Sequence, residues 1–405
     1  MRYWKPLLVI ILLLTFPVGS EAASRTFPFH VAYASRIIKP SHISQAQMDN
    51  AVRQHYAAWK SAYLRHLGGE YWIKYNGSNS TVSEAHGYGM VLTAYMGDRA
   101  IFNSMLRYFK AHPSHLSPHL MAWKQTYSNG AMVNVSGPDS ATDGDLDIAY
   151  ALLLADAQWG SAGAIDYKAE ALLVLHAVLA REVNGATMTL KVGDWATGGD
   201  AKLTRPSDFM TGHMLAFARA DAANAKTWKS LHAKIAALVN FQFTHGSENT
   251  GLMPDFMVEE GADFVPAHGT VLEGPHDGDY SYNACRTPWR LAMSAIVDGD
   301  TAMLEPLRRQ SRWIRTLTSG NPSRIKAGYY VRNGVNGQAF AGYADLPFTA
   351  PFAVAAMLDG AKGQGWLNAM WNSITGGDYG VTTDYYGDSI RMQVLLTVSG
   401  NWWTP

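Results

Sequence analysis

Apolar residues recur at helical spacing along most of the chain, and this pattern constrains the fold more than any other feature. Between Gln45 and Leu67 the apolar positions follow at steps of three and four, which predicts one buried helical stripe. The same spacing predicts helices over 87–109, 145–159, 169–183, 207–220, 228–243, 288–297, 302–317, 349–358, 365–374 and 386–397. Alternating strand patterns are scarce, with 188–192 and 328–330 as short exceptions.

About a dozen helices in succession predict an all-α fold, and we expect an (α/α)6 toroid of six helical hairpins around a central axis. No sequence repeat at a fixed period is visible, which argues against a solenoid of near-identical units. Polar loops such as 194–200 are expected to line one end of the toroid, because functional residues concentrate on loops held by a rigid scaffold.

The N-terminus has the pattern of an export signal. Arg2 and Lys5 precede an apolar run over 6–16, and residues 20–22 offer a small-x-small cleavage site, so we predict a signal peptide over 1–22. An uncleaved anchor is the alternative, although the run is shorter than the roughly 20 apolar residues that span a bilayer. Residues 23–405 contain no linker or block of like charge, which indicates one domain. The mature chain is expected to be secreted, either extracellular or periplasmic, with no membrane span.

The amino-acid composition argues against some classes of ligand and favours others. The single cysteine, Cys285, excludes an internal disulfide. The 33 basic and 33 acidic residues balance, which argues against a nucleic-acid partner. With 13 Trp, 20 Tyr and only 16% charged residues, the chain could form an aromatic groove on which sugar rings stack. A large helical core would bury as many aromatic side chains, so this signal does not stand alone.

Three segments place charged residues beside glycine or proline at the start of a predicted helix: 83–90, 141–150 and 282–290. A carboxylate at such a position lies near the N–H groups of the first turn. Helix capping explains one acid, but Asp143, Asp145 and Asp147 stand at alternate positions, and one cap needs only one acid. A calcium loop is the alternative interpretation; it requires a glutamate at its twelfth position, where this chain has Leu154. We therefore expect no metal.

The segment 141–150, Ala-Thr-Asp-Gly-Asp-Leu-Asp-Ile-Ala-Tyr, resembles the signature of glycoside hydrolase family 8. The segments 83–90, 193–195, 286–290 and 400–403 are also similar to that family, in order, from about Lys39 to the C-terminus. The resemblance implies an (α/α)6 barrel without a cofactor. It also implies a catalytic domain that cleaves glycosidic bonds with inversion, using an acid and a base rather than a covalent nucleophile.

The resemblance assigns roles to individual residues. Glu84 matches the proton donor, and its pKa must then be raised for it to stay protonated near neutral pH. Asp143 matches the aspartate that holds the sugar in a distorted shape close to the transition state. Arg286 matches an arginine that orients the reacting region; a buried ion pair with Asp143 or Asp147 is the alternative, and both could hold.

The catalytic base is less directly indicated. Where one branch of the family has a basic aspartate, this chain has Asn283, and an amide cannot accept a proton. The resemblance then implies a base from an inserted loop just upstream, here 259–279. We predict Glu273, with solvated loop charges as the alternative. The other acids of that loop are Glu259, Glu260, Asp263, Asp277 and Asp279.

By the family pattern, Trp123, Trp195, Tyr385 and Tyr386 are expected to stack against sugar rings, beside Asn283 and Arg286 in substrate binding. We predict a monomeric endo-hydrolase of β-1,4-glucan or mixed β-1,3-1,4-glucan, with the β-linked polysaccharide as its partner. Chitosanase is the runner-up, because the loop 259–279 is acidic and chitosan is polycationic; xylanase comes third. A non-catalytic glycan-binding toroid that has lost its base is the rival from another class.

Overall fold

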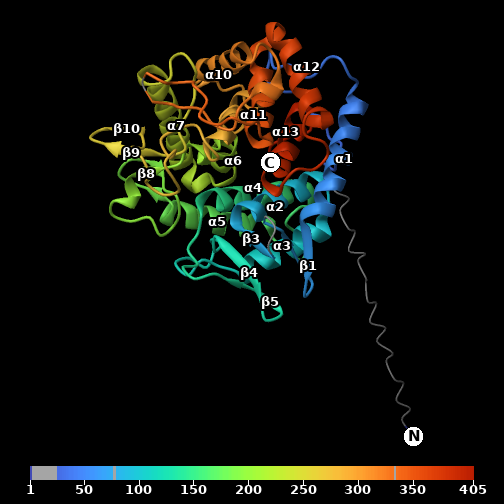
Figure 1. The fold of residues 1–405 in the computed structure, drawn as a ribbon. Helices are drawn as coiled ribbons and strands as arrows, with labels where there is room; N and C mark the ends of the chain where they lie inside the picture. Colours follow the sequence, from blue (N-terminus) through green and yellow to red (C-terminus); the bar gives the residue numbers. More distant parts are fainter. Residues whose placement is uncertain (2–24, 76–78, 333) are drawn as a thin grey trace.

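The computed structural model describes residue 1 and residues 25–75, 79–332 and 334–405 (Figure 1). The predicted signal peptide therefore lies, apart from Met1, outside the described residues. Within them, no helix is both long enough and apolar enough to cross a membrane.

The structure is predominantly helical, as the periodicity predicts. The α-helices of the described chain are α1 (Gln45–Tyr63), α2 (Ser83–Met96), α3 (Arg99–Ala111), α4 (Thr142–Trp159), α5 (Tyr167–Arg181), α6 (Thr211–Ala220), α7 (Ala225–His245), α8 (Thr287–Arg290), α9 (Met293–Val297), α10 (Leu304–Leu317), α11 (Leu346–Ala356), α12 (Gln364–Asn372) and α13 (Tyr385–Val398). Short 3-10 segments supplement them, of which η2 (Pro206–Asp208), η4 (Ala284–Arg286) and η6 (Met357–Gly363) matter below.

Two of the predicted helices are broken in the structure. The predicted helix 87–109 is two helices, because Gly97 adopts φ 80° and ends α2 in a left-handed cap before α3 begins. The predicted helix 288–297 is likewise divided into α8 and α9. The end of the first predicted helix is wrong, since 64–67 form a strand.

The strands are short and antiparallel. They form the sheets β1-β2, β3-β4-β5, β6-β7 and β8-β9-β10, with β1 (Leu64–Leu67), β2 (Glu70–Ile73), β3 (Ser80–Val82), β4 (Lys124–Ser128), β5 (Ala131–Asn134), β6 (Val183–Asn184), β7 (Thr189–Leu190), β8 (Leu203–Thr204), β9 (Met257–Glu260) and β10 (Asp263–Pro266). Gly68 and Gly69 explain β1, because both have positive φ and join Leu67 to Glu70 in a two-residue hairpin turn. The expected strand 188–192 is β7, and 328–330 contributes isolated bridges through Tyr329.

The helices differ in how they are buried. Every residue of α11 is buried, and α2, α4 and α13 are buried on nearly all sides. By contrast, α3 and α10 bury one face only. Helix α2 packs against α4 and α13, and α13 packs against α11 (Figure 1). These inner helices meet solvent only near their ends.

Two glycines allow α2 and α4 to approach closely. A Cβ on Gly144 would lie 2.6 Å from the backbone carbonyl carbon of Ser83, and a Cβ on Gly87 would lie 2.8 Å from the Cβ of Asp147. No larger residue fits at either position without moving a helix. The first turns of α2 and α4, which carry Glu84 and Asp143, are thereby brought together.

Candidate active site

The first turns of α2, α4 and α13 open into one groove of about 500 Å³. Its remaining walls come from the segment before η2, the loop after β10, and the residues around η4. The lining residues are Tyr75, Val82, Ser83, Glu84, Trp123, Ala141, Asp143, Arg205, Glu273, Tyr282, Asn283, Asp345, Pro347, Asp384, Tyr385 and Tyr386.

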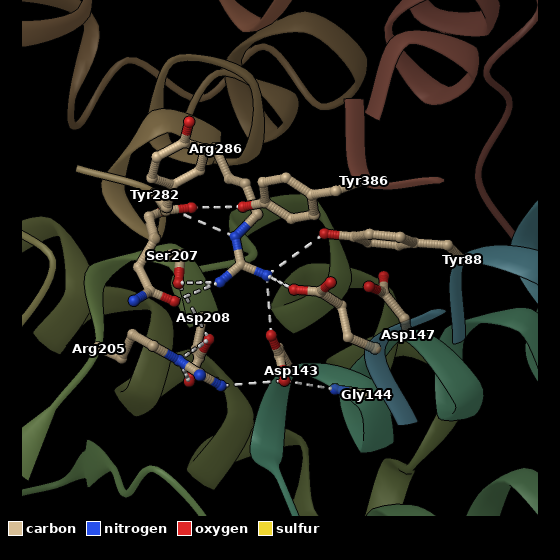
Figure 2. A network of polar contacts seen from close by, with 12 residues as sticks. Tyr88, Asp143, Gly144, Asp147, Arg205, Ser207, Asp208, Tyr282, Arg286 and Tyr386 are labelled. Atoms are coloured by element: carbon tan, nitrogen blue, oxygen red, sulfur yellow. Dashed lines mark hydrogen bonds and ion pairs between the residues drawn. The ribbon is translucent and has the colours of Figure 1, made fainter. Parts of the chain in front are cut away.

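Glu84 and Asp143 lie together in this groove, as the sequence predicts. One guanidinium nitrogen of Arg286, Nη1, contacts both carboxyl groups. It lies 2.8 Å from Asp143 Oδ2 (Figure 2) and also donates to Glu84 Oε2. The Glu84 side chain is 16% exposed and that of Asp143 is 3% exposed. The pair is neither far apart nor sealed in the interior.

Burial raises the pKa of Glu84 above its ordinary value. The guanidinium of Arg286 works against this shift, and the neighbouring Asp143 carboxylate adds to it. The Tyr385 hydroxyl, which donates to Glu84 Oε1 at 2.7 Å, favours the ionised form. Burial prevails, so the pKa of Glu84 shifts in the direction that a proton donor needs.

Asp143 responds in the opposite direction. Burial alone would raise its pKa, but three guanidinium groups, those of Arg205, Arg286 and Arg290, hold the pKa of this carboxyl well below its usual range. Arg205 Nη2 lies 3.0 Å from Asp143 Oδ1. Two adjacent carboxyl groups with pKa values shifted apart can play different roles: Glu84 can carry a proton while Asp143 stays ionised.

A relay of planar groups joins Glu84 to Glu273. Arg286 Nη2 donates to Asn283 Oδ1 at 2.9 Å, and Asn283 Nδ2 donates to Glu273 Oε2 at 2.8 Å. The two glutamates are thus connected through a guanidinium and an amide. Asn283 cannot take up a proton, but it fixes the orientation of Glu273, which the structure brings to the groove as predicted.

A buried carboxylate anchors the loop that carries Glu273. Asp277 is 2% exposed, and its oxygens accept hydrogen bonds from four successive backbone N–H groups at 2.8–3.0 Å. The donors are Val271, Leu272, Glu273 and Gly274.

The other acids of this loop lie away from the groove. Asp279 is also buried and pairs with Arg332 Nη2 at 2.8 Å. Asp277 and Asp279 are structural and do not line the groove, while Glu259 and Glu260 lie in β9 and Asp263 in β10.

The acidic triplet of α4 divides among three environments. Asp143 faces the groove, whereas Asp147 accepts from Arg290 Nη2 at 2.9 Å and from His213 Nε2 at 3.0 Å. Asp145 accepts from the Met121 backbone N–H at 2.8 Å. Because the three side chains have separate partners, they do not form a calcium loop. No metal-holding group of three or more His, Cys, Asp or Glu side chains occurs in the part of the chain that the structure describes.

Asp145 forms a buried carboxyl pair with Glu182. The two side chains are neighbours, and both are completely buried. Burial and mutual repulsion raise the pKa of Asp145 well above its usual value, and burial raises the pKa of Glu182 to about 8. Ser140 Oγ donates to Glu182 Oε1 at 2.5 Å. Two neighbouring buried carboxyl groups cannot both stay ionised near neutral pH, so the pair holds at least one proton.

The predicted stacking residues do not all reach the groove. Trp123 lines it and is 39% exposed, and Tyr386 lines it with its ring 5.8 Å from the Arg286 guanidinium. Tyr385 also lines it but is buried, and its hydroxyl is bonded to Glu84. Trp195 does not line the groove; it packs against the small cluster of Val192, Ala196, Leu203, Phe256 and Ala267. The expectation that Trp195 stacks on substrate therefore finds no support in its position.

Sequence reasoning missed the segment 205–208. Arg205 lines the groove, pairs with Asp143, and is itself held by Asp208 at 3.0 Å. Ser207 Oγ accepts from Arg286 Nη2 at 2.8 Å. Burial raises the pKa of Asp208 to about 6. The sequence offers only an Arg-Pro-Ser-Asp string here, which predicts a helix cap and gives no sign of an ion pair with a distant aspartate.

Comparison with known proteins identifies the family. The model of the glycosyl hydrolases family 8 matches residues 27–400. A β-glucanase of Niallia circulans is 43% identical over 400 residues, covering 97% of this chain and 95% of the relative. An endoglucanase of Bacillus sp. (strain KSM-330) is 33% identical over 404 residues, covering 94% of this chain and 82% of the relative.

Solved structures agree. The apo structure of a β-1,3-1,4-glucanase from Paenibacillus sp. X4 superposes with a TM-score of 0.90 at 42% identity, covering 95% of this chain and all of that one. A cold-adapted family 8 xylanase in complex with substrate superposes with a TM-score of 0.72 at 21% identity, covering 88% of this chain and 92% of that chain. At that identity the likeness to the xylanase shows the fold alone.

Proposed function

Because the chain belongs to glycosyl hydrolase family 8 and is a glycoside hydrolase, we propose that it is an endo-acting, inverting β-glucanase. Its substrates would be β-1,4-glucan and mixed β-1,3-1,4-glucan, in line with the β-glucanase, endoglucanase and β-1,3-1,4-glucanase that it resembles most among the relatives above. The observation that carries the mechanism is the relay from Glu84 through Arg286 and Asn283 to Glu273, along one open groove.

Glu84 supplies the acid. As the glycosidic bond breaks, its carboxyl proton moves to the departing sugar oxygen, and a raised pKa keeps that proton available near neutral pH. Substrate in the groove displaces water from this side chain, which strengthens the same effect. The hydroxyl of Tyr385 holds the carboxyl group in place.

Glu273 supplies the base. A water molecule held between Glu273 and the sugar attacks the anomeric carbon, and Glu273 takes the proton that this water loses. Inverting enzymes separate acid and base by roughly 6.5–9.5 Å to leave room for the water. The guanidinium and amide that lie between the two glutamates support such a separation.

Asp143 stays ionised and binds the sugar at the cleavage point. Its negative charge stabilises the positive charge that develops on the ring, and its fixed position favours the distorted sugar. It forms no covalent bond, since inversion needs no nucleophile on the protein.

The test is hydrolysis of carboxymethyl cellulose, lichenan, xylan and chitosan by the wild type, Glu84→Gln and Glu273→Gln. We expect reducing ends from the two glucans, and a loss of at least about 100-fold in kcat for either variant. Proton NMR of the first products should show the inverted anomer. A retained anomer, or a Glu273→Gln enzyme with full activity, would contradict the assignment of the base.

Chitosan is the second candidate substrate. Besides the protonated Glu84, carboxylates outnumber guanidinium groups among the lining residues, with Asp143, Glu273, Asp345 and Asp384 against Arg205. A polycation would be attracted to that surplus. Asp345 and Asp384 also cap α11 and α13, which accounts for their presence without a substrate. Faster hydrolysis of chitosan than of lichenan would favour this candidate.

The finer organisation follows from family membership as a proposal. We infer that the helices close into six hairpins around one axis, that 23–405 form a single catalytic domain, and that 1–22 direct secretion. The monomeric state stays a prediction.

A further inference from the structure

A second cleft, of about 710 Å³, lies between the segment before α1, helix α10 and η6. Its lining residues are Arg36, Ile37, Ile38, Arg308, Arg312, Arg315, Asp359, Gly360, Ala361 and Lys362. None of these lines the catalytic groove. Helix α10 lies at the periphery of the molecule (Figure 1, upper edge).

The cleft concentrates positive charge in a chain whose formal charges balance. Four arginines and one lysine face a single carboxylate, Asp359. Within the described residues, Arg36, Arg308 and Arg315 have no carboxylate within 4.0 Å, and only Arg312 is paired, with Glu305 at 2.7 Å. Asp359 instead accepts from Ser311 Oγ at 2.7 Å.

The guanidinium groups are held in place by the backbone. Arg308 Nε donates to Leu358 O at 2.8 Å, and Arg315 Nη1 donates to Lys362 O at 3.1 Å. Both carbonyl groups belong to η6, the opposite wall. Each guanidinium uses one N–H group for this hydrogen bond. Its other N–H groups are therefore held in a fixed direction and are available to a ligand.

Helix α10 repeats its arginines on one face. Positions 308, 312 and 315 follow at steps of four and three, so their side chains are neighbours. Like charges at this spacing destabilise an isolated helix. At the rim, Arg36 adopts φ 73°, a left-handed conformation that is unfavourable for a residue other than glycine. Such strain persists where the surrounding structure requires it and is common in binding sites.

We propose that this cleft binds a multivalent oxyanion, phosphate or sulfate, either free or carried as an ester on a carbohydrate polymer. Planar guanidinium groups donate parallel pairs of hydrogen bonds to such oxygens, and a di-anion would neutralise the repulsion along α10. The site is distinct from the catalytic groove and does not depend on the proposed glucanase activity.

The proposal is tested by calorimetric titration of the full-length mature protein with inorganic pyrophosphate and, separately, with dextran sulfate. Arg308→Gln and Arg315→Gln should each weaken binding by about tenfold, the loss expected for one charged donor pair. Arg36→Gln should also weaken it; this side chain forms no hydrogen bond or ion pair among the described residues, so the variant should fold normally. Glucan hydrolysis should be unchanged in all three.

Arg309→Gln is the matched control, because Arg309 lies on the same helix but outside the cleft. Its affinity should equal that of the wild type. Pyrophosphate binding would identify a free ion as ligand, whereas binding of dextran sulfate alone would identify the esterified polymer. Absence of binding to both probes, or equal weakening by Arg309→Gln, would overturn the proposal.

Discussion

Replacing Glu182 by glutamine should make the stability of this protein less dependent on pH. The buried pair of Glu182 and Asp145 holds a proton that the unfolded chain releases near pH 4.5, the ordinary value for a glutamic acid. Since the pKa of Glu182 is raised to about 8, the native state binds more protons than the unfolded state between these values. The stabilisation is complete below about pH 4.5 and is lost as the pH rises through about 8.

The size of the effect follows from the proton count. The proton on Glu182 alone lowers the free energy of unfolding by about 1.4 kcal/mol for each unit by which the pH rises, so by roughly 4 kcal/mol between pH 5 and pH 8. Asp145, whose pKa is also raised, adds to the slope in both the wild type and the variant. In Glu182→Gln the amide oxygen can still accept from Ser140, and the amide N–H can donate to Asp145 in place of the shared proton. In that variant the unfolding free energy should therefore fall less steeply with pH, by the contribution of about one proton.

The assay is urea unfolding at intervals from pH 5 to pH 8.5. The curve of Glu182→Gln should be flatter than that of the wild type and cross it at alkaline pH. Glu170→Gln, a change at a partly exposed position of α5 that pairs with Lys110, should shift the curve without altering its slope. Parallel curves for wild type and Glu182→Gln would refute the shared proton.

Three further changes probe the groove. Asn283→Asp sets a second carboxylate against Glu273, and like-charge repulsion should move the acidic limb of kcat/KM upward by about one pH unit. An unmoved limb would contradict Glu273 as base. Asp277→Asn replaces one of the two oxygens that accept from the four loop N–H groups with an amide nitrogen, which cannot accept, so kcat should fall about tenfold with little change in melting temperature. Full activity would show that the anchor is dispensable. Gly144→Ala forces α2 and α4 apart and should cost about 1–3 kcal/mol of unfolding free energy together with activity, whereas Gly163→Ala, whose Cβ meets nothing closer than 3.7 Å, should be neutral in both measurements.

The helices were predictable because their burial is periodic. The apolar positions of α1 and α10 follow the helical repeat, and the predicted limits of most helices lie within four residues of the observed ones. The positions at which helices end were harder to predict from the sequence. Gly97 ends α2 through its backbone conformation, and the Gly68-Gly69 turn creates a hairpin where apolar spacing alone continues a helix.

The site was predictable where a residue acts through its own chemistry. Glu84, Asp143, Asn283 and Arg286 stand in motifs at helix starts, and the structure brings all four together. Contacts between segments that are distant in the chain could not be predicted from any pattern in the sequence. Arg205 reaches Asp143 across 62 positions of the chain only because η2 packs against the start of α4.

The acid and the base are held by different kinds of structure, a buried helix and a surface loop. The position of the base can therefore be altered by mutation more independently than that of the acid. Glu84 belongs to a helix wedged among neighbours on nearly every side, so repositioning it disturbs the whole interior. Glu273 belongs to a surface loop clasped by the single carboxylate of Asp277. Residues around Glu273 can therefore be substituted, in evolution or by engineering, while Asp277 is kept. Such substitutions would change how the attacking water is positioned and would leave the protonation of the departing sugar intact.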